Sequence, residues 1–301
     1  MPVSKTILQK IKQGDFQSLA KAITIVENDL DGYKELLSSL TINEHTKVIG
    51  ITGPPGAGKS SLVNALLNHL TKSDKKIAII AVDPTSPFNY GAILGDRIRL
   101  ADHYNNPNIF IRSIASRKSL GGLSDKIIEI TDVLRSANFD YIFIETVGVG
   151  QSEVEIAGLA DTTIVTLVPE AGDEIQTMKA GLMEIADMFV VNKSDRPGAD
   201  AFTNNLKQLT HATTKESWET PVIKTVATKN LGIDELIDAI NKHHHENITN
   251  EKQAHLYAEK IYQLIQKRKM NDISQEDILE KVKIALKEGA INIHKIVKQY
   301  I

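Results

Sequence analysis

The chain has 301 residues, which is enough for one large domain or for a core domain with appendages. Its 35 lysines and arginines against 38 aspartates and glutamates give a formal net charge of −3, which gives no support to nucleic-acid binding as the main role. The absence of cysteine excludes disulfides, zinc–thiolate sites, iron–sulfur clusters and cysteine nucleophiles.

The first residues, MPVSKTILQKIKQGDF, lack the long apolar core and small-residue cleavage site of a secretory signal. No run of about 18 apolar residues occurs, so no membrane span is predicted. We therefore expect a cytoplasmic protein that contacts neither a membrane nor a nucleic acid.

Residues 1–46 are predicted to form a helical extension, because their apolar residues recur at helical spacing. Gly14 followed by Asp15 indicates a break and then the N-cap of the next helix.

The character of the sequence changes at residue 47, where short runs rich in β-branched residues begin. These predicted strands are KVIGIT (47–52), KIAIIAVD (76–83), NIFIRS (108–113), YIFIET (141–146), TTIVTLV (162–168), MFVVNK (188–193) and PVIKTVA (221–227). Predicted helices separate most of them, at 59–70, about 120–137, 174–186, 201–213 and 232–245. Apolar strands alternating with helices predict the α/β class, with a doubly wound, mostly parallel sheet covered on both faces.

Residues 248–301 are predicted to form a charged helical arm that follows the core domain of 47–247. AHLYAEKIYQLIQKRK, within this arm, is typical of an amphipathic helix. The acid among its basic residues and its lack of Trp or Phe argue against a membrane-surface helix, so we expect a homodimerisation arm.

The segment GPPGAGKS (53–60) matches the phosphate-binding pattern G-x-x-x-x-G-K-[ST], with a predicted strand before it and a helix after it. Its glycines let backbone N–H groups turn toward phosphates, and the helix N-terminus favours an anion. We expect Lys59 to neutralise the β- and γ-phosphates and Ser60 to bind Mg²⁺. The predicted nucleotide contacts here are Gly53, Pro54, Pro55, Gly56, Ala57, Gly58, Lys59, Ser60 and Ser61.

The segment NKSD (192–195) follows another predicted strand and fits the guanine-reading pattern N-K-x-D. Asp195 can accept from the N1–H and the amine of guanine, whereas adenine lacks this pair of donors. Lys193 can lie along the base, and Asn192 can join the base loop to the phosphate loop. In TVA (225–227), Val226 stands where Ser is usual, and the Ala227 N–H is a candidate donor to the guanine oxygen.

Three acids near strand ends are candidates for the Mg²⁺ shell: Asp83, Asp96 and Glu145. Glu145 stands where many GTPase switches have Asp, and Gly148 follows it three residues later. Asp83 and Asp96 can alternatively cap a helix or a turn.

Six segments together resemble the MeaB/ArgK-like GTPases: GDFQSLAKAITIVEN, GPPGAGKSS, VDPTSP, GDRIRL, ETVGVGQSE and PEAGDEIQTMKAGLMEIADMFVVNKSD. The resemblance implies an accessory protein of a cobalamin-dependent acyl-CoA mutase, in which GTP hydrolysis gates cobalamin loading. It also implies a Glu before the switch, Mg²⁺-shell roles for Asp83, Asp96 and Glu145, and a C-terminal arm used in homodimerisation. Lys179, in the segment 169–179, is expected to approach the nucleotide when a partner is bound.

The expected catalytic residues are therefore Lys59, Glu145 and Lys179. No Gln directly follows the switch glycine, because Val149 does. Gln151, Arg97 and Arg99 are further candidates, so we expect slow intrinsic hydrolysis that a partner stimulates.

Other functions stay open at this point. A metal-delivery GTPase usually carries Cys and His ligands, which the lack of cysteine disfavours. A transport-linked nucleotide-binding protein and a GTP-dependent scaffold are further alternatives. The methylmalonyl-CoA mutase is the default partner and the isobutyryl-CoA mutase its near rival. HHHE (243–246) and Trp218 are expected at the surface.

Overall fold

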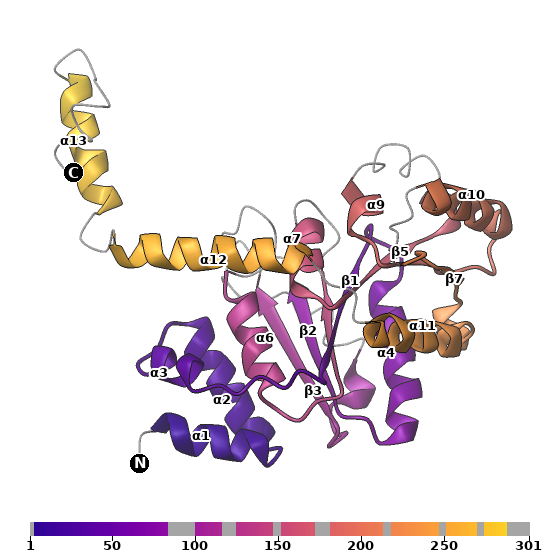
Figure 1. Cartoon of the computed structure of the whole chain (residues 1–301), viewed down its shortest axis with the longest axis horizontal. Helices are drawn as coiled ribbons and strands as arrows, with labels where there is room; N and C mark the ends of the chain where they lie inside the picture. Colours follow the sequence, from indigo (N-terminus) through magenta and orange to yellow (C-terminus); the bar gives the residue numbers. More distant parts are fainter. Residues whose placement is uncertain are drawn as a thin grey trace. The chain divides into compact units, whose positions relative to one another are not determined.

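The structure is a computed structural model that describes residues 3–83, 100–115, 125–146, 152–171, 181–212, 218–246, 251–269 and 274–287. The chain divides into two compact units, Met1–Gln253 and Ala254–Ile301. Figure 1 labels the elements of both.

Seven parallel strands form one sheet in the described part of the first unit, in the order β3-β2-β4-β1-β5-β6-β7. The strands are β1 (Lys47–Thr52), β2 (Ile77–Asp83), β3 (Ile109–Ala115), β4 (Tyr141–Glu145), β5 (Thr162–Leu167), β6 (Met188–Val191) and β7 (Val222–Lys224). Most of their residues are apolar because a parallel sheet is buried on both faces. This confirms the predicted fold class.

The register brings the carboxyl ends of the central strands together. Ile51 of β1 lies opposite Glu145 of β4, and Thr52 lies opposite Val165 of β5. β1 thus has β4 on one side and β5 on the other, and the chain completes β2 to β4 before it crosses to β5. Such a change of direction is where open α/β sheets bind ligands, outside the carboxyl ends of the strands.

Helices cover both faces of this sheet. The described helices of the core are α4 (Lys59–Leu70), α6 (Ile127–Arg135), α7 (Ser152–Leu159), α9 (Gly181–Ile185), α10 (Ala199–Ala212) and α11 (Ile233–His245), with the 3-10 turns η1 (Thr71–Ser73), η2 (Ala101–His103), η3 (Pro169–Ala171) and η4 (Ala227–Lys229). Apolar residues of α4 and α11 share one buried cluster with β1, β2 and β4. Residues of α7, α9 and α10 share a second cluster with β5 and β6.

The N-terminal extension consists of α1 (Val3–Lys12), α2 (Phe16–Glu27) and α3 (Tyr33–Ser38). Gly14 has a φ of +87°, and the Asp15 carboxylate accepts from Gln17 N and Ser18 N, both at 3.2 Å. This confirms the predicted break and N-cap.

The extension belongs to the same compact unit as the sheet. The ring of Phe16 lies 5.5 Å from that of Phe110 on β3 and 5.9 Å from that of Phe139. An ion pair of 2.8 Å between Arg112 of β3 and Glu27 of α2 adds a second attachment. Aromatic packing and a half-buried ion pair therefore fix the extension to the edge of the sheet.

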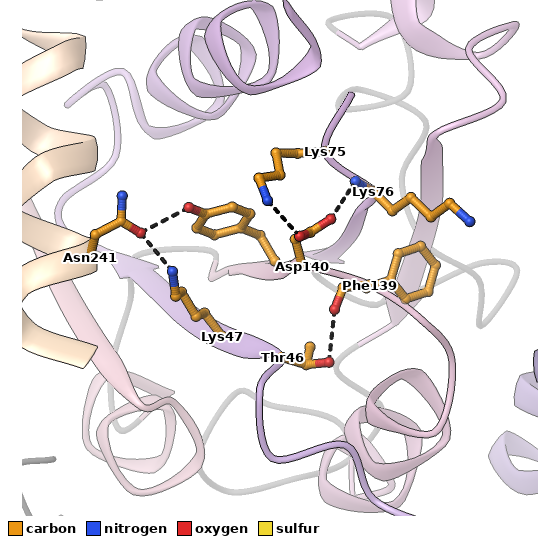
Figure 2. Close-up of polar contacts among 8 residues, drawn as sticks. Thr46, Lys47, Lys75, Lys76, Phe139, Asp140 and Asn241 are labelled. Carbon is orange, nitrogen blue, oxygen red and sulfur yellow. Dashed lines mark hydrogen bonds and ion pairs between the residues drawn. The ribbon is translucent and has the colours of Figure 1, made fainter. Parts of the chain in front are cut away.

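A hydrogen-bonded cluster joins the amino edge of the sheet to the end of α11 (Figure 2). Lys47 Nζ and the Tyr141 hydroxyl both donate to Asn241 Oδ1, at 2.7 and 2.9 Å. The Lys47 ammonium also lies 5.0 Å from the centre of the Tyr141 ring. Burial, with the nearby charge of Lys75, lowers the pKa of Lys47.

Asp140 holds the start of β2 in the same region (Figure 2). Its carboxylate accepts from Lys75 Nζ and from the backbone N–H of Lys76, both at 2.9 Å. Thr46 Oγ1 donates to the Phe139 carbonyl at 2.8 Å. Side-chain hydrogen bonds, two of them to backbone groups, therefore link the beginnings of β1, β2 and β4.

The expected surface positions of Trp218 and His243 were wrong. Trp218 is 8% exposed and His243 is 3% exposed. Their rings meet edge to face at 4.7 Å, and Trp218 Nε1 donates to the Asp187 carbonyl at 2.8 Å. The first histidine of HHHE points inward because α11 continues to His245 and turns this position toward the sheet.

The second compact unit contains α13 (Gln275–Lys287) and most of α12 (Glu251–Lys269). Its exposed apolar side chains are Ile261, Tyr262, Leu264 and Ile265 on α12, and Leu279 and Ile284 on α13. Among the described residues, none of the helices combines the length and apolar character needed to cross a bilayer.

Candidate functional site

The phosphate loop connects β1 to α4 and depends on glycines at two closely packed positions. Gly53 has a φ of +136°, and a Cβ there would lie 2.1 Å from the Thr166 carbonyl oxygen. Gly58 has a φ of +88°, and a Cβ there would lie 2.4 Å from Asn192 Nδ2. Any other residue would meet both backbone strain and a clash, so the path of the loop requires glycine.

Lys59 places a positive charge at this loop. Its side chain is buried, and Nζ donates to the carbonyls of Gly53 at 2.7 Å and Pro54 at 3.2 Å. Pro54 and Ala57 are buried, whereas Pro55, Gly56 and Ser61 are exposed. An ammonium group, exposed loop backbone and the first turn of a twelve-residue helix together suit a bound anion.

Ser60 and Glu145 meet beside the loop. The Ser60 hydroxyl donates to Glu145 Oε1 at 2.6 Å, and both residues are buried. β4 ends next to β1, which explains how residues 85 positions apart come into contact. Two of the predicted metal-shell residues are therefore adjacent.

The other predicted metal ligands are less fully defined. Asp83 is the last residue of β2, which pairs with β4, whereas Asp96 lies outside the described residues. Within the described ranges, no group of three His, Cys, Asp or Glu residues could hold a metal ion by itself. Mg²⁺ commonly uses one or two protein oxygens together with phosphate and water, so Ser60 and Glu145 fit Mg²⁺ that arrives with a nucleotide.

Asn192 joins the base loop to the phosphate loop, as expected. Its Nδ2 donates to the Ala57 carbonyl at 3.0 Å. Its Oδ1 accepts from Ala227 N and from Thr225 Oγ1, both at 3.2 Å. Lys193 makes a second connection, because its Nζ donates to the Gly56 carbonyl at 2.7 Å. The two sequence motifs therefore form one continuous site at the carboxyl edge of the sheet.

Asp195 lies at the exposed side of this site. Lys229 Nζ of η4 contacts its Oδ2 at 2.8 Å. This hydrogen bond, aided by the positive charge of Lys229, lowers the pKa of Asp195 below its ordinary value. The carboxylate is therefore ionised at neutral pH, as an acceptor of two N–H groups must be.

The TVA segment differs from the expectation in one detail. The Ala227 N–H donates to Asn192 in this structure, so a contact from it to a guanine oxygen stays a prediction. Val226 is buried, and its backbone N–H donates to the Leu231 carbonyl at 3.1 Å.

Three contributors were not identified from the sequence. Thr225 supports Asn192, Thr166 packs its backbone against Gly53, and Lys229 binds Asp195. The sequence offered only a weak signal for Lys229, namely a basic residue two positions after the TVA segment, because its closeness to Asp195 arises in the fold.

Several predicted site residues fall outside the part of the chain that the structure describes. They are Asp96, Arg97, Arg99, Gly148, Val149, Gln151 and Lys179. Glu170, at the start of the segment 169–179, is described and forms a 2.6 Å ion pair with Arg196 of the base loop.

Comparisons with known proteins agree with this geometry. A family model described as "Methylmalonyl Co-A mutase-associated GTPase MeaB" matches residues 19–287. A putative GTPase of Pyrococcus abyssi is 48% identical over 242 residues, which cover 79% of this chain and 75% of that protein. A "Fused isobutyryl-CoA mutase" of Geobacillus kaustophilus is 33% identical over 256 residues, which cover 78% of this chain and 24% of that protein.

One solved structure, titled "Crystal structure of LAO/AO transport system kinase", matches with a TM-score of 0.71 and 26% identity. The match covers 98% of this chain and 95% of that chain, which supports the fold described above.

Proposed function

The chain belongs to the MeaB family of GTPases, and from this premise we propose that it is a GTP-hydrolysing accessory protein that gates cobalamin loading of a cobalamin-dependent acyl-CoA mutase and protects that enzyme. The observation that carries the nucleotide part is the bond from Asn192 Nδ2 to the Ala57 carbonyl, at 3.0 Å. It holds a phosphate-binding loop and a guanine-reading loop at one sheet edge, at a separation fixed by the fold.

In this proposal, residues 53–61 bind the phosphates and Lys59 neutralises their charge. Ser60 and Glu145, with Asp83 and Asp96, form the shell of Mg²⁺, directly or through water. The metal, when bound with GTP, withdraws charge from the phosphates. Ser60 supplies a hydroxyl oxygen at this position, and Glu145 supplies a carboxylate that already orients that hydroxyl.

Guanine selectivity is assigned to Asp195, with Lys193 along the base and Ala227 at the base oxygen. Adenine offers the Asp195 carboxylate no matching pair of N–H donors, so it would lack the two bonds that guanine makes. Lys179 is assigned to the catalytic set that a partner completes. The isolated protein is expected to hydrolyse GTP slowly, on the order of 10⁻⁴ to 10⁻² s⁻¹.

The mutase assignment is supported by the family description and by the fused mutase, of which this chain matches only a part. Methylmalonyl-CoA mutase is the default partner, and an isobutyryl-CoA mutase is the near rival. Both catalyse reactions on acyl-CoA substrates, so the identity of the partner needs a direct test.

We assign residues 1–46 to the helical extension, 47–247 to the GTPase domain and 248–301 to a homodimerisation arm. The arm assignment is supported by the exposed apolar residues on α12 and α13, which a second copy would cover. A cytoplasmic location is part of the same proposal.

The test is to measure GTP hydrolysis by the purified protein, alone and with a cobalamin-dependent acyl-CoA mutase from the same genome, with ATP as the control substrate. Slow hydrolysis of GTP, stimulation by the mutase and no hydrolysis of ATP are expected. GTP binding without any response to such a mutase would remove the assigned partner and favour metal delivery or scaffolding. Hydrolysis of ATP at a comparable rate would favour a transport-linked role and contradict the guanine assignment.

A further inference from the structure

The base-reading acid Asp195 has a cationic partner in the turn that closes the base loop. Lys229 Nζ lies 2.8 Å from Asp195 Oδ2. The two side chains are 60% and 42% exposed, so the pair sits at the rim of the site rather than in the core. This contact joins two residues that are 34 positions apart in the sequence.

The turn that carries Lys229 is held firmly at both ends. Ala227 N donates to Asn192 Oδ1, and Lys229 N donates to the Val226 carbonyl at 2.9 Å. Asn230, with a φ of +54°, ends the turn. The turn that contains Lys229 is thus bonded to Asn192, which also bonds to the phosphate loop. This fixes the position of the backbone from which the Lys229 side chain extends.

The side chain of Val226 cannot form a hydrogen bond to Asp195 in place of Lys229. Val226 has no polar side-chain atom, and its backbone N–H is bonded to Leu231. Among the described side chains, Lys229 is the one that donates a hydrogen bond to the Asp195 carboxylate.

We propose that Lys229 is a positioning residue for guanine recognition, whose ammonium group holds the Asp195 carboxylate in the orientation that reads the Watson–Crick edge of the base. This inference rests on the proposed function. It assigns no contact between Lys229 and the nucleotide itself.

The chemistry of the carboxylate permits this arrangement. Each carboxylate oxygen has two lone pairs, so Oδ2 can accept from Lys229 and still accept one N–H of guanine, while Oδ1 accepts the other. The lowered pKa of Asp195 agrees with such a role, and Arg196 contributes in the same direction with a smaller effect. An exposed pair is screened by solvent and salt, so its contribution to affinity is modest.

The test compares Lys229→Ala and Lys229→Arg in two backgrounds, the natural chain and Asp195→Asn. Asparagine at 195 can donate to the second carbonyl of xanthine, so Asp195→Asn is expected to lose guanosine diphosphate and to bind xanthosine diphosphate. With the natural Asp195, Lys229→Ala should weaken guanosine diphosphate binding about two- to five-fold, as for an exposed ion pair, and Lys229→Arg should restore most of the loss.

In the Asp195→Asn background, Lys229→Ala should leave the affinity for xanthosine diphosphate unchanged, because no carboxylate remains to be held. Lys224→Ala is the matched control, since it removes an exposed lysine from a 2.8 Å pair with Asp200, and Lys224 is not among the predicted nucleotide contacts. Lys224→Ala should change neither the affinity of the natural chain for guanosine diphosphate nor that of Asp195→Asn for xanthosine diphosphate. High salt should shrink the effect of Lys229→Ala.

An equal loss in both backgrounds would overturn the inference, because Lys229 would then act through the fold of the turn. No loss in the natural background would overturn it as well. Failure of the proposed function gives a different pattern: the natural chain would not prefer guanosine over adenosine diphosphate, or Asp195→Asn would not change base preference. Either of those results removes both proposals.

Discussion

At the carboxyl edge of the sheet, Lys59, Asn192 and Lys193 donate to carbonyl oxygens of a single loop. At the amino edge, Lys47 and Tyr141 donate to a side chain of α11. Side chains form hydrogen bonds at both edges. At the carboxyl edge the acceptors all belong to the glycine-containing loop between β1 and α4, whereas at the amino edge the bonds join elements of the core to one another. Similar polar side chains therefore bind the backbone of one loop at the carboxyl edge and join elements of the core at the amino edge.

The largest effect is expected from Lys59→Ala. The variant removes the charge that lies at the loop, so affinity for guanosine diphosphate should fall by about 100-fold, the value of a strong hydrogen bond to a charged group. Calorimetric titration with Mg²⁺ present measures it. Lys72→Ala, at an exposed position in η1, is the matched control and should bind as the natural chain does. An unchanged affinity for Lys59→Ala would remove the phosphate assignment.

The contact between the two loops can be broken with a matched pair of glycine variants. Gly56 and Gly58 have similar positive φ values, +79° and +88°, but only at Gly58 would a Cβ meet Asn192, at 2.4 Å. Both variants should lose about 1 kcal/mol of stability from backbone strain, and Gly58→Ala about 1 to 3 kcal/mol more from the clash. Chemical denaturation measures this difference.

Gly58→Ala should also bind guanosine diphosphate more weakly than Gly56→Ala, because Asn192 must move and the base loop moves with it. Equal stability and equal affinity of the two variants would mean that Asn192 does not join the loops in solution.

Asp132 lies on α6 and takes part in neither set of hydrogen bonds. Burial, partly opposed by the Arg135 charge, raises the pKa of Asp132 to about 6 from 3.8. Its protonated form is therefore favoured in the folded state, and stability is lost as the pH rises from about 4 through 6. Asp132→Asn should be more stable than the natural chain by about 1 to 2 kcal/mol at pH 7.5 and equally stable near pH 3.5.

Urea titrations at the two pH values measure this difference. If Asp132→Asn stabilised the protein equally at both pH values, ionisation of the carboxylate would not be the cause of the stabilisation. Nucleotide affinity should not respond to Asp132→Asn, since this residue lies at neither of the two edges.

The smallest effect is expected at the amino edge, from Asp140→Ala. Burial opposes the charged form of Asp140, but the hydrogen bonds from Lys75 and Lys76 prevail and lower its pKa. A depressed value means that the contribution to stability is present above pH 3.8 and is lost as the pH falls through the folded-state pKa. The variant should lose about 1 kcal/mol at neutral pH, since the ion pair is half-exposed.

Thermal unfolding at pH 7 and pH 3 measures the effect of Asp140→Ala, which should be smaller at the lower pH. Asn241→Ala should behave as a second amino-edge variant, because it removes the acceptor of Lys47 and Tyr141. A large loss of nucleotide affinity in either would contradict the division between the edges.

Much of the fold and the centre of the site could be predicted from sequence. The alternation of apolar strands and helices indicated the parallel sheet, and the carboxyl ends of such strands meet at one edge. The contact of Asn192 with the phosphate loop followed from this placement and is present at 3.0 Å.

What could not be predicted depends on packing between distant segments. The attachment of the extension through Phe16 and Phe110 joins residues 94 positions apart, and no local pattern encodes that pairing. Trp218 and His243 looked like surface residues because their neighbours in the sequence are polar, yet both rings are buried. The partner of Asp195 was missed because Lys229 reaches it only once β6 and β7 lie side by side.

The most direct test of the two-edge account is thermal unfolding of the natural chain, Lys59→Ala and Asp140→Ala, each with and without Mg²⁺ and excess guanosine diphosphate. A ligand that binds only the folded state raises the unfolding temperature by mass action. We expect Asp140→Ala to unfold at a lower temperature but to keep the full increase with nucleotide, whereas Lys59→Ala should lose most of that increase. Loss of the nucleotide-dependent increase in Asp140→Ala, or its retention in Lys59→Ala, would contradict the account.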